Sequence, residues 1–77
     1  MEFQPDDRVK TRHDEILDRT DGTSEVFIPA GHGGVVVETF RFAAGQVHWH
    51  EVRVRLDPIN GVNYLLKTEP IFFEKEQ

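Results

Sequence analysis

Apolar residues in this chain form short runs, and none of the runs has the spacing of a helix. Val35–Phe42 is the clearest run, a series of β-branched and aromatic residues that predicts a strand. Val47–Asp57 alternates instead, with Val52, Val54 and Leu56 separated by charged residues. This alternation is typical of a strand that has one face in the core and the other in water.

The two predicted strands are joined by Ala43–Gln46, which has the length and composition of a hairpin connection. A period of two residues divides the first strand into two faces. One face would carry Val35, Val37 and Thr39, and the other Val36, Glu38, Phe40 and Phe42. Both faces contain apolar residues, so we expect one of them to be covered by a partner or by the chain ends.

A proline and three glycines mark the segment Ile28–Val37. Pro29 ends one segment, and Gly31 to Gly34 predict a tight turn that leads into the strand. Phosphate-binding glycine loops open a helix and often carry Lys followed by Ser or Thr, whereas this loop opens a strand. We therefore interpret it as a structural turn and keep His32, at its tip, as a candidate ligand contact.

The remaining runs predict a first strand within Arg8–Arg12 and two late strands, Val62–Lys67 and Ile71–Glu74. His13–Glu25 is polar and is expected to be a long loop, with a single helical turn over Glu15–Arg19 as the alternative. Together these elements predict a small all-β barrel or sandwich.

The length of 77 residues predicts a single domain over residues 1–77, with residues 1–5 and 75–77 flexible. A chain this short has a small core, and its lack of cysteine removes disulfides as a source of support. Additional stability must then come from packing, from oligomers or from a metal site built of histidines and carboxylates.

The chain is acidic, with a formal net charge of −5 and a pI of about 5.2. Proteins that bind nucleic acid usually present a basic face, so the charge argues against a nucleic-acid partner. Apolar runs are all shorter than the ~20 residues of a membrane span, and the N-terminal residues lack the pattern of a signal peptide. We therefore expect a cytoplasmic protein without a membrane partner.

Three segments in order carry a resemblance: Asp7–Lys10, then Ile28–Val36, then Val52–Asp57. This order, over about residues 6 to 74, resembles SH3-like barrels, among them KOW-type modules, the nitrile hydratase β subunit and the peripheral subunit of photosystem I. The resemblance implies a five- to six-stranded antiparallel SH3-like barrel with a long polar first loop. It also implies service as a binding or accessory subunit.

His48-Trp49-His50 is the most specific local motif in the chain. Residues i and i+2 of a strand point to the same side, so His48 and His50 could bind one transition metal, with Glu38, Glu51 or His32 as a further ligand. The alternative is that both imidazoles extend the face of Val52 and cap the core. No other cofactor is expected.

Trp49 would fall on the opposite face, next to Phe40 and Phe42. The alternative for Trp49 is half-burial under the polar loop. We predict a non-catalytic protein-interaction module that docks on a protein partner or on its own copy, forming a homo-oligomer. Its predicted contact residues are Phe40, Phe42, Trp49, Arg53 and Arg55. The alternative is a small oligomeric enzyme or metal-dependent binder, with His48, His50 and His32 at a subunit interface.

Overall fold

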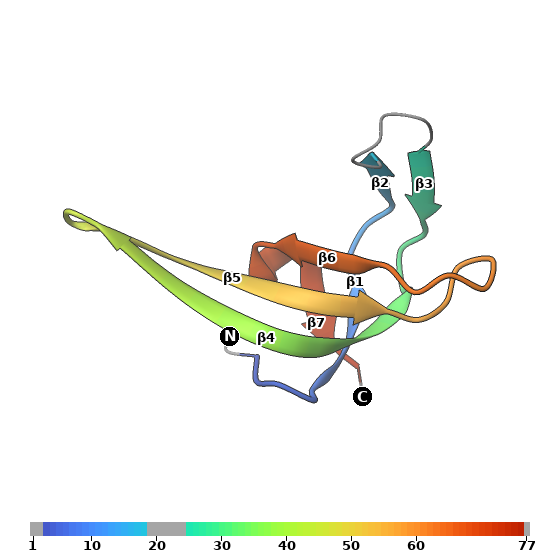
Figure 1. The fold of residues 1–77 in the computed structure, drawn as a ribbon, viewed down its shortest axis with the longest axis horizontal. Helices are drawn as coiled ribbons and strands as arrows, with labels where there is room; N and C mark the ends of the chain where they lie inside the picture. Colours follow the sequence, from blue (N-terminus) through green and yellow to red (C-terminus); the bar gives the residue numbers. More distant parts are fainter. Residues whose placement is uncertain (1–2, 19–24, 77) are drawn as a thin grey trace.

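The computed structural model describes residues 3–18 and 25–76 (Figure 1). These residues form seven strands and one short 3-10 helix. The elements are β1 (Arg8–Thr11), β2 (Glu15–Asp18), β3 (Glu25–Ile28), β4 (Gly33–Ala44), β5 (Val47–Leu56), β6 (Leu65–Thr68), η1 (Pro70–Phe72) and β7 (Phe73–Lys75).

Five strands make one antiparallel sheet in the order β6-β5-β4-β1-β7, and β2 pairs with β3 in a separate hairpin. The prediction of an all-β, antiparallel fold is confirmed. Within the described residues the pairing leaves β6 and β7 as the two edges of the sheet, and no closed barrel is detected. Figure 1 shows the β2–β3 hairpin standing away from the sheet, and the long β4–β5 hairpin extending beyond its neighbours.

The core lies on the inner face of the five-stranded sheet. Val52, Val54 and Leu56 of β5 are all at most 2% exposed, which confirms the face predicted from their alternation. The other buried apolar residues come from both ends of the chain and from the middle: Phe3, Val9, Ile28, Val36 and Phe73. Phe3 belongs to this core although it precedes the first strand.

A β-bulge in β4 corrects the predicted faces of this strand. Val36 pairs with Val54 and Glu38 pairs with Arg53, so Val37 is an additional residue with no partner in β5. Val36 is therefore buried on the inner face, whereas Glu38 and the aromatic residues beyond it lie on the outer face. The prediction that Val36 shares a face with Phe40 was wrong, because the bulge shifts the alternation by one residue.

The predicted polar loop His13–Glu25 is also corrected, because it contains β2 and the first residue of β3. Glu15–Asp18 is β2 rather than loop or helix, and it pairs with Glu25–Ile28. Leu17 and Val26 pack against the core, which anchors this hairpin to the sheet. The turn signal Asp21-Gly22 lies outside the described residues.

The C-terminal part differs from the prediction in its boundaries. The strand expected over Val62–Lys67 is observed at Leu65–Thr68, so it begins three residues later and ends one residue later. It follows an Asn60-Gly61 turn in which both residues have positive φ. Ile71 lies in η1, and the closing strand begins at Phe73. In the part of the chain that the structure describes, no helix has the length and apolar character needed to cross a membrane.

Candidate functional site

The outer part of the β4–β5 hairpin has no third strand beside it within the described residues. β6 pairs with β5 only over Val52–Arg55, and β1 pairs with β4 only over Gly33–Val35. Residues 39–51 therefore form a two-stranded ribbon, which we call the arm, and it projects from one end of the molecule (Figure 1). The turn at its tip is Gly45-Gln46, where a φ of 63° at Gly45 suits a two-residue hairpin.

The outer face of the arm carries an aromatic row, formed by Phe40, Phe42 and Trp49. The ring centroids of Phe42 and Trp49, which are cross-strand neighbours, are 5.3 Å apart with an interplanar angle of 17°. Phe40 continues the row at 6.1 Å from Phe42. Trp49 is 38% exposed and Val47, on the same face nearer the tip, is 63% exposed. Phe40 and Phe42 are half-buried, so the outer face of the arm is an apolar surface that is most exposed toward the tip.

Charged side chains border the aromatic row, and each forms an ion pair. Lys67 Nζ of β6 lies 4.5 Å from the centroid of Phe40 and 5.5 Å from that of Phe42. Arg53 lies over Phe40 at 5.5 Å and donates to Glu38 Oε1 at 3.2 Å. Lys67 in turn lies 3.8 Å from Glu51 Oε1. The border therefore contains cations and carboxylates in equal number, and cation–π contacts fix the two cations against the rings.

The inner face of the arm carries the two histidines of the His48-Trp49-His50 motif. His48 is opposite Ala43 and His50 is opposite Arg41, and all four residues are exposed. β5 is regular from Val47 to Leu56, so both imidazoles lie on the side of Val52 and Val54, as the sequence predicts. They point away from the aromatic row.

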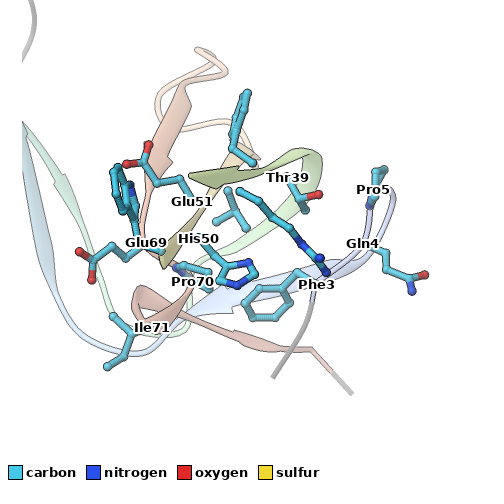
Figure 2. Close-up of a pocket in the computed structure, with 13 residues that line it drawn as sticks. Phe3, Gln4, Pro5, Thr39, His50, Glu51, Glu69, Pro70 and Ile71 are labelled. Carbon is cyan, nitrogen blue, oxygen red and sulfur yellow. The ribbon is translucent and has the colours of Figure 1, made fainter. Parts of the chain in front are cut away.

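A cleft of about 710 Å³ lies at the root of the arm. Its floor includes Thr39 and His50, and its sides are the N-terminal segment Phe3–Pro5 and the segment Glu69–Ile71 around η1 (Figure 2). Figure 2 places the ring of Phe3 beside the imidazole of His50. The cleft therefore lies along β5 at the root of the arm, and it is lined by the core residues Phe3 and Val52 as well as by His50 and Trp49 of the arm.

His32 lies at the opposite end of β5 from the other two histidines. Its Nε2–H donates to the backbone oxygen of Asp57 at 2.9 Å. His50 precedes Asp57 by seven residues, which corresponds to about 23 Å of extended strand. A single chain therefore does not bring His32 together with His48 and His50. Among the described residues, no three His, Asp or Glu side chains gather closely enough to hold a metal ion.

A second polar cluster surrounds Asp57 and ties both ends of the chain to β5. Nη1 and Nη2 of Arg8 donate to the two carboxylate oxygens of Asp57, each at 2.9 Å, and Nη2 also donates to Glu76 at 3.2 Å. The hydrogen bonds from Arg8 lower the pKa of Asp57, and the charge of Arg8 acts in the same direction while burial opposes it. We interpret this cluster as a structural clasp.

Two residues that lie against the arm or its cleft were not identified from the sequence. Phe3 forms one wall of the cleft, and an aromatic residue isolated in a polar N-terminal segment was the available signal. The contact of Lys67 with the aromatic row has no sequence signal, because it depends on the pairing of β6 with β5. Arg55, a predicted contact residue, lies in β5 two residues beyond Arg53 and pairs with Leu65.

Comparisons of the chain with protein-family models, with curated proteins and with solved structures give no match.

Proposed function

We propose that the chain is a non-catalytic protein-interaction module that docks on a protein partner through the outer face of the arm. The observation that carries this proposal is the aromatic row on a ribbon that projects from the sheet, in which Trp49 is exposed and Phe40 and Phe42 are half-buried. Aromatic side chains are favoured anchors of protein interfaces because they bury a large area with little loss of conformational entropy.

The fold proposed for this module is an SH3-like barrel variant. The short first strand β1 pairs with both β4 and the closing strand β7, which supports this assignment. The extended β4–β5 hairpin distinguishes this chain within that proposal. An accessory subunit of this kind would use the sheet as a rigid base and the arm as the contact.

The paired charges favour a protein partner over a nucleic acid. Arg53 and Lys67 are the cations closest to the aromatic row, and each is neutralised by a carboxylate of the same face. Affinity for nucleic acid comes from cations that neutralise phosphates and release their counterions. The two cations beside the aromatic row are already paired with carboxylates. Retention on heparin that decreases with salt and depends on Lys67 would instead favour the nucleic acid.

Trp49 provides a direct readout because it is the only tryptophan of the chain. Docking on the arm should shift its fluorescence to shorter wavelength, and partners captured by the wild-type protein should be lost with Phe42→Ala and Trp49→Ala. The matched control is Phe27→Ala, which removes a ring that is 57% exposed on the β2–β3 hairpin, away from the arm. If Trp49→Ala and Phe27→Ala capture the same partners with equal yield, the proposal is wrong.

A further inference from the structure

The edge of β5 that faces away from β4 is open along the arm. The backbone N–H of Leu56 donates to the oxygen of Tyr64, so Leu56 directs its backbone groups toward the β6 side. In an antiparallel sheet this direction alternates along a strand, and β5 contains no irregularity. His48 and His50 therefore direct their N–H and C=O groups to the same side, beyond the last residue of β5 that pairs with β6.

The surroundings of this edge leave room for another strand. After β6 the chain turns into η1, which contacts β5 at the root of the arm and lines the cleft together with His50 (Figure 2). The edge is therefore unpaired from the root of the arm toward its tip. Among the described residues no strand pairs with Val47–Glu51 on that side. An open strand edge is a template for pairing with a second chain.

We propose that two copies of this chain pair antiparallel along this edge, about a two-fold axis at Trp49, and that their four histidines bind one zinc-class metal ion. In this register His48 of each copy lies opposite His50 of the other, as a hydrogen-bonded pair. Each such pair exchanges two backbone hydrogen bonds. Both imidazoles of each copy lie on the inner face, so all four gather on one side of the joined sheet.

The spacing of the four histidines suits one metal ion. Alternate residues of a strand are about 6.8 Å apart, and hydrogen-bonded cross-strand partners have Cα atoms about 5.5 Å apart. Imidazoles on such a rectangle can converge on a single ion at the Zn–N distance of about 2.0–2.1 Å. Imidazole is a ligand suited to zinc, copper and nickel, and four nitrogen ligands around a closed site favour tetrahedral zinc.

The metal supplies what the short strand pairing lacks. Val47–Glu51 is too short to hold two chains together by backbone hydrogen bonds alone, because even an isolated hairpin is marginal in water. A single chain contributes only two ligands, so the metal site is incomplete without the second copy. His32 takes no part in it, since it is held at the other end of β5.

One neighbour opposes cation binding and provides a test of the site. Arg41 is the cross-strand partner of His50 on the inner face, and its positive charge lies near the proposed ion. Replacement of this charge, in Arg41→Gln, should therefore tighten metal binding by several-fold.

The four histidines lie on the face of the arm opposite the proposed docking surface, so metal binding does not depend on the docking function. Antiparallel pairing at Trp49 brings the two aromatic rows side by side on the outer face, so the dimer would present one wider docking surface.

The test uses the full chain without an affinity tag, with ZnCl₂ as the probe. Sedimentation velocity should show a monomer in EDTA and a dimer with zinc, and calorimetry should give one zinc per two chains. His48→Ala and His50→Ala should each weaken zinc binding at least tenfold and abolish the zinc-dependent dimer. Cobalt should give the intense visible absorption of a tetrahedral site in the wild-type dimer.

The controls separate the two proposals. His13→Ala removes an exposed histidine outside the arm and should leave zinc binding unchanged. Trp49→Ala removes the ring but retains both imidazoles, so it should abolish docking and leave the zinc-dependent dimer. The metal proposal is overturned if zinc leaves the mass unchanged, if it binds once per chain, or if His48→Ala binds it like the wild type. Circular dichroism confirms that each variant is folded.

Discussion

Asp57 illustrates how a polar side chain can secure this fold although it is not buried. Arg8 holds its carboxylate with two hydrogen bonds, and both side chains are less than half exposed at 44% and 43%. The bonds connect β1 to the end of β5, and Glu76 adds the C-terminal segment to the same arginine. Ion pairs this exposed are screened by water and salt, so the clasp contributes modestly.

The lowered pKa of Asp57 makes this contribution dependent on pH. A carboxyl group whose pKa is lower in the folded than in the unfolded chain stabilises the fold above its ordinary pKa of about 3.9. The stabilisation is lost as the pH falls through the lower, folded value. We expect Arg8→Gln to reduce stability against urea at pH 7, and we expect its difference from the wild type to shrink as the pH falls below the ordinary pKa of the carboxyl group.

A matched control for this prediction is Lys75→Gln, which removes a cation that makes a single 3.7 Å contact with Asp7. Its effect at pH 7 should be smaller than that of Arg8→Gln, because one ammonium contact is weaker than a bidentate pair. A loss of stability in Arg8→Gln that is equally large at pH 7 and pH 2 would show that the arginine acts through packing and not through Asp57.

β4 and β5 differ in how far their structures follow from their sequences. β5 alternates apolar and charged residues, and its two faces, including the positions of His48 and Trp49, were predicted correctly. β4 carries three successive valines at its bulge, and nothing in their chemistry indicates that Val37 is the unpaired one. The bulge is set by the register between the turn at Gly45 and the core, which is a property of two strands together.

The β2–β3 hairpin was missed for a related reason. Its inward pair, Leu17 and Val26, is half-buried, while the outward pair, Ile16 and Phe27, is 61% and 57% exposed. A segment with so few buried residues resembles a loop by composition.

The aromatic row was predicted only in part. The sequence predicts that Trp49 lies near Phe40 and Phe42, but the cation–π contacts of Lys67 depend on a third strand, β6.

The bulge also yields a prediction about the arm. Deletion of Val37 removes the unpaired residue and leaves Val36 opposite Val54 and Glu38 opposite Arg53, so neither face changes. Because Val37 is 45% exposed, we expect the deletion to change the free energy of unfolding by only about 1 kcal/mol. The Phe42–Trp49 contact should persist in NMR spectra, while the arm loses the bend that a bulge gives a strand.

Deletion of Val35 is the control for this prediction. It would move Val36 off the inner face or displace β4 relative to β1, and burial of a valine is worth about 1.5–3 kcal/mol. Urea unfolding should therefore separate the two deletions clearly. Equal destabilisation by both would mean that the extra residue at Val37 is required by the fold and not merely accommodated.

The chain combines a small core with a large exposed apolar surface. Eight apolar residues of the described part are buried, and nine large apolar side chains are exposed. The arm contributes Val47 and Trp49 to the exposed set, and η1 contributes Ile71 and Phe72. The docking function proposed above would bury part of this exposed surface. The small core also means that each core residue carries a large share of the stability.

Phe3 is the core residue that best links stability to the arm. It is 7% exposed, packs in the core and also forms a wall of the cleft at the arm's root. Truncation of a buried phenylalanine to alanine costs about 3–5 kcal/mol. A single core in a chain of this size supplies about the same total. We therefore expect Phe3→Ala to be largely unfolded at 25 °C, which circular dichroism and urea titration would detect.

Two variants make the Phe3 prediction specific. Phe3→Leu keeps an apolar side chain in the core, so it should remain folded with a lower urea midpoint and an arm root that opens more readily to hydrogen exchange. Phe27→Ala removes a ring that is 57% exposed and should shift the urea midpoint only slightly. If Phe3→Ala unfolds at the same urea concentration as Phe27→Ala, the N-terminal segment does not close the core in solution. The cleft at the root of the arm would then lack its N-terminal wall and would be bordered by η1 alone on its other side.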